Sequence, residues 1–347
     1  MTESGPMRVV LGHIERFDET VAAFARQLGV TGVQLHCPSN LSGERGYWSL
    51  SELVALREEV ERHGLVLEGI ENVPNDQFDE VRRGGPGRDE QLERFLVTVR
   101  NLAAAGIPVL GYNFLVTYVW RTDVAAEGRG GARVTAFDLA SAGEANALGS
   151  YKLVPAAQVR EPVSAEQLWD AYAYFLDAVL PVAEEVGLRL ALHPDDPPVE
   201  VPLGGAERIF TSPAALRRAM DMAKGSPASG VDLCLGTVSS MGGEAAVEEA
   251  IDLLSPDGRI YYVHFRDVQG WVPSFKECFL GEGNYRPASV MRRLAASGFR
   301  GFIIDDHVPA MVLDEDTWVG VSTSAYCSRG RAWAMGYLQG LLEAISG

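Results

Sequence analysis

The sequence predicts a (β/α)8 barrel, in which eight parallel strands close into one sheet and each strand is followed by a helix. Eight short apolar runs alternate with eight amphipathic stretches, the pattern of βαβ units in a parallel sheet. The length of 347 residues suits one such barrel. An open, doubly wound sheet is the alternative, but no GxGxxG follows the first apolar run, which weakens its dinucleotide-binding form.

The apolar runs and the stretches between them predict the individual elements. Strands are expected at 7–12, 31–36, 65–71, 107–113, 188–193, 230–235, 259–265 and 300–306. Helices are expected at 18–28, 50–63, 89–105, 165–186, 212–224, 244–255, 287–297 and 326–345.

Two connections are longer than a barrel needs: 114–164, after the fourth strand, and 307–325, after the eighth. Both follow strands, so both are expected at the catalytic face, where long loops form lids or substrate walls. The sequence contains no clear linker. We therefore expect one domain over 1–347, with a flexible N-terminus at 1–6.

Composition excludes several classes of function. No run of about eighteen apolar residues is present, and the start lacks a secretory signal, so a cytoplasmic protein is expected. The net charge of −17 opposes nucleic-acid binding, and an anionic substrate would need a local cation or metal. The cysteines are far apart, without a CxxC pair, and are expected to be free thiols or metal ligands rather than disulfides: Cys37, Cys234, Cys278 and Cys327.

Four metal-competent side chains fall at the ends of four consecutive predicted strands. They are His193, Cys234, His264 and Asp306. In a barrel these strand ends converge on one mouth, where active sites occur. Two imidazoles, a thiolate and a carboxylate would suit Mn²⁺, Fe²⁺, Co²⁺ or Zn²⁺. Taken singly, each residue has a simpler explanation, since a lone Cys is usually a small core residue and a strand-end His a structural group.

The stretch "LRLALHPDDPP" (188–198) contains the first of these residues, His193, followed by Asp195 and Asp196. The two acids are expected to orient groups around the metal, although a solvated turn is an equal alternative. The two prolines that follow keep a helix from starting early.

The hexapeptide "HPDDPP" (193–198) is similar to the hallmark of mannonate dehydratases, which are metal-dependent sugar-acid enzymes with a xylose-isomerase-like barrel. Further segments resemble that family in the same order. They are "YNF" (112–114), "RTD" (121–123), "FD" (137–138), "LCLGTV" (233–238), "IYYVHFRDV" (260–268), "SFKE" (274–277), "DDHVPAM" (305–311) and "YCSRGR" (326–331).

The resemblance implies conversion of D-mannonate to 2-keto-3-deoxy-D-gluconate with loss of water, that is, a hydro-lyase. It implies Mn²⁺ or a similar ion on the four residues already named. It also implies that His307 and Tyr326 share the roles of base and acid, because a base must remove the C2 proton and an acid must protonate the leaving C3 hydroxyl. Which residue takes which role stays open.

Substrate binding needs cations and hydrogen-bonding groups. The candidates are Arg121, Asn113, Arg266 and Lys276. Arg331 is another candidate, but we expect it to be a charged residue on the surface of the last helix. The partner is therefore a small sugar acid, and a homo-oligomer stays open.

The chain departs from the family at several positions. The family's strand-8 motif reads Arg-Pro-Asp-His-Gly-His, and here its Arg is Ile304 and its second His is Pro309. Val119 replaces an Asp, Lys276 replaces a His after "SF", and Cys37 replaces the second of two adjacent His residues. We expect these changes to fall in the substrate wall, so the substrate itself could differ.

Three other functions remain possible from the sequence. A metal-dependent isomerase or epimerase of the same superfamily would use the same ion but retain the water. A sugar-acid sensor would not need a thiolate ligand. A DNA-repair nuclease on this fold is opposed by the acidic charge.

Overall fold

The computed structural model describes most of the chain, namely residues 6–143, 145–148, 152–155, 159, 161–314 and 326–346. The expected flexible N-terminus, apart from residue 6, and residues 315–325 of the expected lid lie outside the described residues. Among the helices that the structure describes, none is long and apolar enough to cross a membrane.

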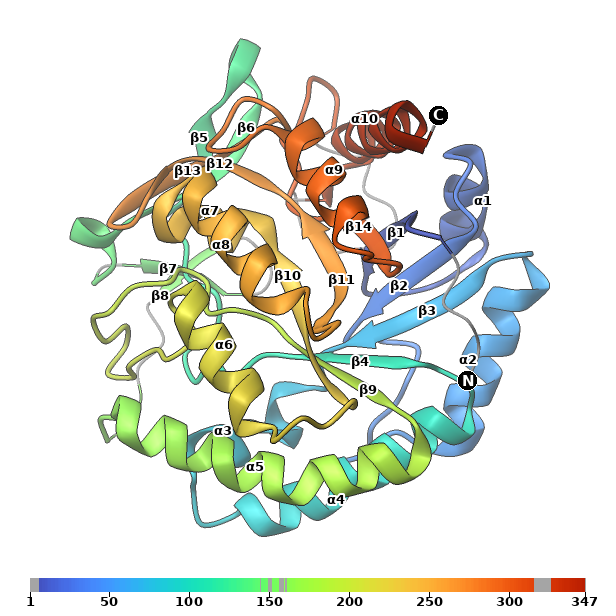
Figure 1. The fold of residues 1–347 in the computed structure, drawn as a ribbon, viewed down its shortest axis with the longest axis vertical. Coiled ribbons are helices and arrows are strands. Elements are labelled where there is room, and N and C mark those ends of the chain that lie inside the picture. Colours follow the sequence, from blue (N-terminus) through green and yellow to red (C-terminus); the bar gives the residue numbers. More distant parts are fainter. Residues whose placement is uncertain are drawn as a thin grey trace.

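Eight parallel strands close into a barrel, with helices around it (Figure 1). The strands are β1 (Arg8–Ile14), β2 (Gly32–His36), β3 (Val66–Glu71), β4 (Val109–Tyr112), β9 (Arg189–Leu192), β10 (Ser229–Cys234), β11 (Ile260–Phe265) and β14 (Phe302–Asp305). Each pairs with the next in this order, and β1 pairs with β14 to close the ring. All eight predicted strands are confirmed, each within two residues at either end.

The helices confirm the other half of the prediction. They are α1 (Glu19–Gln27), α2 (Leu50–Arg62), α4 (Arg88–Ala104), α5 (Ala165–Val186), α6 (Pro213–Met222), α8 (Glu244–Leu254), α9 (Pro287–Ala296) and α10 (Ser328–Ser346), with two unpredicted helices, α3 (Asp79–Arg83) and α7 (Leu235–Gly242). Local signals fix the ends of α5: Ser164 and Gln167 form a capping box, and Gly187 ends the helix with φ 74°.

Antiparallel strands missed by the prediction lie at the carboxyl end of the barrel. They are β5 (Asp123–Glu127), β6 (Arg133–Asp138), β12 (Asp267–Trp271) and β13 (Ser274–Cys278), which form one sheet in the order β12-β13-β6-β5, and β7 (Ala145–Leu148) and β8 (Lys152–Pro155), which form a hairpin. Three 3₁₀ turns lie at Asn75–Gln77, Arg129–Gly131 and Leu139–Ser141. The expected loop after the fourth strand is thus partly β-structure.

Apolar side chains fill both the layer between strands and helices and the centre of the barrel. The central cluster consists of Val10, Val109, Ala191, Tyr261, Tyr262, Phe302 and Ile304. None of these residues is the last of its strand. The interior is therefore a packed core, and polar side chains collect beyond it, at the carboxyl ends of the strands.

Candidate metal centre

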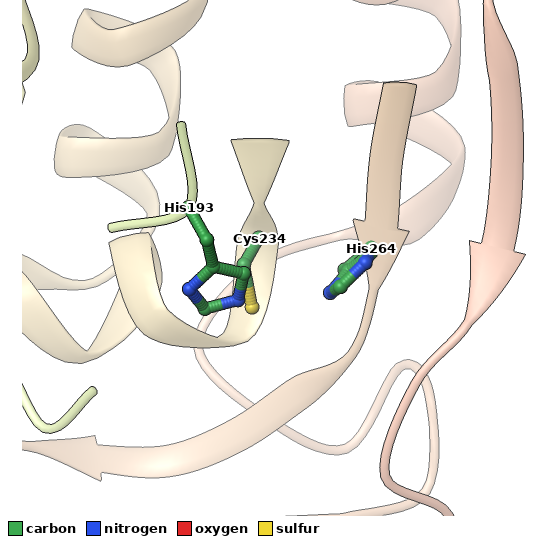
Figure 2. A group of neighbouring side chains, drawn as sticks. All are labelled: His193, Cys234 and His264. Carbon is green, nitrogen blue, oxygen red and sulfur yellow. The ribbon is translucent and has the colours of Figure 1, made fainter. Parts of the chain in front are cut away.

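The four predicted metal ligands come together at the carboxyl ends of their strands. His193 directly follows β9, Cys234 ends β10 and His264 lies on β11, and their ligand atoms are all within 4.8 Å of one another (Figure 2). Asp306 directly follows β14, and its Oδ2 is 3.7 Å from both Cys234 Sγ and His264 Nδ1. The arrangement offers an N/S/O donor set around one point.

Barrel pairing and local hydrogen bonds position these side chains. Cys234 and His264 are register partners across β10 and β11. His193 Nδ1 lies 2.6 Å from the carbonyl oxygen of Pro194, so its N–H donates there and Nε2 remains as the ligand atom. Because one ring nitrogen is committed to the backbone, the metal-binding tautomer of His193 is set by the fold.

Electrostatics favour the thiolate form of Cys234. Burial alone would raise the pKa of its thiol, but the Arg266 guanidinium and the neighbouring imidazoles lower the pKa to about 6. Cys234 also occupies the N-cap position of α7, where the helix dipole favours an anion. Thr237 Oγ1 donates a hydrogen bond to Sγ over 3.2 Å. The thiolate is the form that binds metals.

The donor set fits a divalent ion. Nε2 of His264 lies 3.1 Å from two carboxylate oxygens, but its buried Nδ1 makes no hydrogen bond to any residue that the structure describes. Such orphaned groups are costly unless a ligand satisfies them. Two imidazoles with a thiolate and a carboxylate suit a transition-metal ion. The buried residues at this point could therefore hold a metal.

The two predicted proton-transfer residues lie beside this centre. Tyr326 donates a hydrogen bond from its hydroxyl to Asp306 Oδ1 over 2.8 Å. His307 Nδ1 lies 2.5 Å from Glu277 Oε1, and the rings of His307 and Tyr326 meet edge to face, 5.5 Å apart. Burial would raise the pKa of Glu277, but His307 and Arg121 lower it to about 2. Glu277 is thus an ionised partner for His307.

A cavity of about 320 Å³ is lined by three of the predicted ligands, namely His193, His264 and Asp306, and by the predicted proton-transfer pair. Five of the six histidines of the chain line it: His13, His36, His193, His264 and His307. Burial lowers the pKa of His13 and of His36, so both are neutral hydrogen-bonding groups. Among the described lining residues, Arg266 is the one with a permanent positive charge. This cavity can accept a small polar anion.

Arg121 and Arg266 converge on one carboxylate, that of Asp196. Arg121 binds both Asp196 oxygens at 2.8 Å, and Arg266 Nη2 donates to Oδ2 at 2.9 Å. Burial opposes ionisation of Asp196, but the two guanidinium groups hold its pKa well below the usual range. Arg266 and Asp196 line the cavity, whereas Arg121 is fully buried outside it. Arg121 therefore fixes its neighbours and does not form the cavity wall.

The other predicted residues divide into those at the cavity and those elsewhere. Asn113 lines the cavity and donates to Asn72 Oδ1 over 3.0 Å. Asp195 accepts hydrogen bonds from the backbone of the segment after it, which excludes a solvated turn. Lys276 lies on β13, donates to the carbonyl oxygen of Glu127 and lines a separate cavity. Lys276 was expected at the substrate wall, but it lines this separate cavity instead.

The expectation that Arg331 is a surface charge is wrong. Its side chain is fully buried, and its Nε donates to Asp305 Oδ2 over 2.8 Å. Asp305 stands where the family motif has Pro, so this pair belongs to the altered strand-8 segment.

Most of the departures also lie away from the predicted substrate wall. Ile304 belongs to the apolar cluster inside the barrel and is fully buried. The described residues that line the cavity include Val119 and Cys37 but not Pro309. The side chain of residue 304 points into the core because it alternates with outward-facing neighbours on β14. The sequence pattern could not distinguish the core from the wall.

Apart from Cys37, the sequence-based prediction missed the cavity residues contributed by the first three strands. His13, Cys37 and Asn72 follow or end these strands, line the cavity and have positive φ, at 46°, 40° and 57°. Strained backbone of this kind is concentrated at functional sites. His13 also stacks on Tyr326, with ring centroids 4.0 Å apart. Their position at strand ends was the signal that could have identified them.

The fold and the site define a xylose-isomerase-like barrel with a candidate metal centre at its mouth. Residues 7–347 match the family described as D-mannonate dehydratase (UxuA). The chain therefore belongs to the mannonate dehydratase family and is a mannonate dehydratase-like enzyme, a hydro-lyase.

Individual relatives agree with this assignment. Mannonate dehydratase 2 of Halalkalibacterium halodurans is 33% identical over 320 residues, which cover 87% of this chain and 89% of the relative. The mannonate dehydratase of Thermotoga neapolitana is 31% identical over 361 residues, covering 96% of each chain.

Solved structures extend the comparison to three dimensions. The crystal structure of mannonate dehydratase from Streptococcus suis serotype 2 superposes with a TM-score of 0.78 at 27% identity, covering 98% of this chain and 94% of that one. A xylose isomerase domain protein from Planctomyces limnophilus has a TM-score of 0.61 at 12% identity, covering 99% of each chain, and shows the shared fold alone.

Proposed function

We propose that the protein dehydrates D-mannonate to 2-keto-3-deoxy-D-gluconate in the cytoplasm, with Mn²⁺ held by His193, Cys234, His264 and Asp306. Fe²⁺, Co²⁺ and Zn²⁺ are alternative ions for the same ligands. One observation carries the proposal: His193, His264 and Asp306 line the same cavity as His307 and Tyr326, and the buried Cys234 lies beside them. The ion would stabilise negative charge on the substrate oxygens as the C2 proton leaves.

The contacts of the two proposed proton-transfer residues support one role for each. The 2.5 Å contact with Glu277 supports a proton on Nδ1 of His307, although Arg266 Nη1 also lies 3.3 Å from that nitrogen. Nε2 is then the basic nitrogen, and we assign it the C2 proton. Tyr326 is the acid: its hydroxyl protonates the C3 hydroxyl as the C3–O bond breaks, and water leaves.

Arg266 and Asn113 bind the substrate. Asp196 and Thr237 hold the Arg266 guanidinium at the cavity, Asp196 over 2.9 Å, where it meets the substrate carboxylate. Asn113 offers hydrogen bonds to hydroxyl groups from the opposite side. Ile304 and Lys276 lie off this wall, and the altered residues that line the cavity are Val119 and Cys37. We keep D-mannonate as the proposed substrate.

The test is an assay of the Mn²⁺-loaded protein with D-mannonate, scored for the 2-keto-3-deoxy product. We expect His307→Ala to lower kcat by about 10²–10⁴-fold. His63→Ala is the matched control, because His63 lies at the end of α2 and pairs with Glu59. Metal-loaded protein that leaves mannonate unchanged would overturn the proposal, and a product of unchanged mass would indicate an isomerase.

A further inference from the structure

His264 stands between the predicted metal ligands and a second group of acids. Its Nδ1 faces Asp306, whereas its Nε2 lies 3.1 Å from Glu71 Oε2 and 3.1 Å from Asp232 Oδ2. Glu71 ends β3, and Asp232 precedes Cys234 by two residues on β10. Two candidate metal groups, one on each side, therefore share one imidazole.

The acidic side is buried, and its Glu71 is held by a hydrogen bond and lines the cavity. Asp232 is fully buried, and neither of its carboxylate oxygens accepts a hydrogen bond from a described residue. Glu71 is buried too, and Gln34 Nε2 donates to its Oε2 over 2.9 Å. Gln34 is in turn held by the backbone N–H of His13 over 2.9 Å. This chain of contacts aims Glu71 at His264 from across the barrel mouth.

The chemistry of imidazole decides between the two sides. A neutral imidazole has one acceptor nitrogen and one N–H, so it cannot bind ions through both nitrogens at once. Histidines that bind metals commonly donate the other N–H to a carboxylate. We propose that His264 binds the ion through Nδ1, and that Glu71 and Asp232 are positioning residues that receive its Nε2–H. This inference rests on the proposed metal centre.

The geometry also predicts how the two acids combine. Neither 3.1 Å contact is aligned as a hydrogen bond, so both oxygens lie beside the N–H direction. After a small rotation of the imidazole ring, either oxygen can accept a hydrogen bond from Nε2–H. Loss of one acid leaves the other in place. Single substitutions should therefore weaken metal binding little, and the double substitution should weaken it by more than the two single effects combined.

The experiment measures metal binding instead of turnover. Metal-free wild type, Glu71→Ala, Asp232→Ala, the double variant and Asp232→Asn are titrated with Co²⁺, following the Cys234 thiolate-to-cobalt absorption. Mn²⁺ stoichiometry and the unfolding midpoint of each metal-free protein are measured in parallel. Glu68→Ala is the control, because Glu68 lies on the same strand but pairs with Arg8.

We expect one ion per chain, and an affinity about 10–100-fold lower in the double variant. Asp232→Asn keeps an acceptor oxygen and should bind like wild type. An unchanged affinity in a folded double variant, or a second ion per chain that the variants lose, would overturn this inference alone. Failure of the wild type to bind any ion would overturn the proposed function with it.

Discussion

Glu277 Oε1 lies 2.5 Å from Nδ1 of His307, and both side chains are buried. The carboxylate comes from β13 in the antiparallel sheet, and the imidazole follows β14 of the barrel. Arg121 Nη2 donates to the same Oε1 over 3.0 Å. This hydrogen bond fixes the position of the carboxylate beside the imidazole. A sheet added to the barrel thus orients the proposed base.

Replacing Glu277 should impair the chemical step. In Glu277→Gln the amide no longer stabilises the proton on Nδ1 as a carboxylate does, so the basic form of Nε2 is less populated and the imidazolium is less stable. We expect kcat to fall by about 10²-fold, with KM changing much less, in steady-state assays of the Mn²⁺-loaded protein. Glu282→Gln, which removes the negative charge of a half-buried partner of Arg129, is the control. An unchanged kcat would refute the role.

The Glu277 carboxylate should also make the free energy of unfolding depend on pH in the acidic range. Its pKa falls from 4.5 to about 2 on folding, so its contribution is complete above the unfolded pKa and is lost as the pH falls through the folded one. The linked free energy is about 3 kcal/mol. Chemical unfolding between pH 5 and 2 should show a shallower loss of stability for Glu277→Gln than for wild type. Parallel curves would contradict the prediction.

The Asp196 carboxylate should be essential to folding stability. Asp196→Ala removes the carboxylate that both Arg121 and Arg266 bind, with Glu277 still beside them. Breaking a buried pair in this way costs about 3–5 kcal/mol. The prediction is tested by denaturant unfolding of metal-free protein. Asp252→Ala removes a surface partner of Arg293 and should change the midpoint little. Equal effects of the two substitutions would argue against the buried network.

The barrel and the metal ligands could be predicted because their signals are local. A capping box at Ser164 and a glycine at 187 mark α5 in the sequence itself. His193, Cys234 and Asp306 end strands whose apolar runs are continuous, so the barrel geometry alone brings them together.

The supporting residues could not be predicted, because they depend on contacts distant in sequence. Glu277 lies on β13, which pairs with β12 and with the sequence-distant β6, and the pairing with β6 leaves no local pattern. Arg331 has the sequence context of a surface residue, yet it is buried against Asp305. Periodicity shows which face of a helix is apolar but does not identify a buried ion-pair partner.

Removing the thiolate should weaken the metal centre without unfolding the barrel. Cys234→Ser keeps the size of the side chain, but a hydroxyl is not deprotonated at neutral pH and is a poor ligand for Co²⁺ or Mn²⁺. We expect the thiolate-to-cobalt absorption to disappear and the affinity for Co²⁺ to fall by at least about 10-fold. Cys278→Ser is the control, because it replaces a thiol of β13 whose pKa is raised by burial. It should keep both the absorption and the affinity for Co²⁺. If Cys234→Ser retained the absorption, the sulfur ligand would have to be another cysteine. Cys37 would then be the residue to replace next, because it is the one cysteine among the described residues that line the cavity.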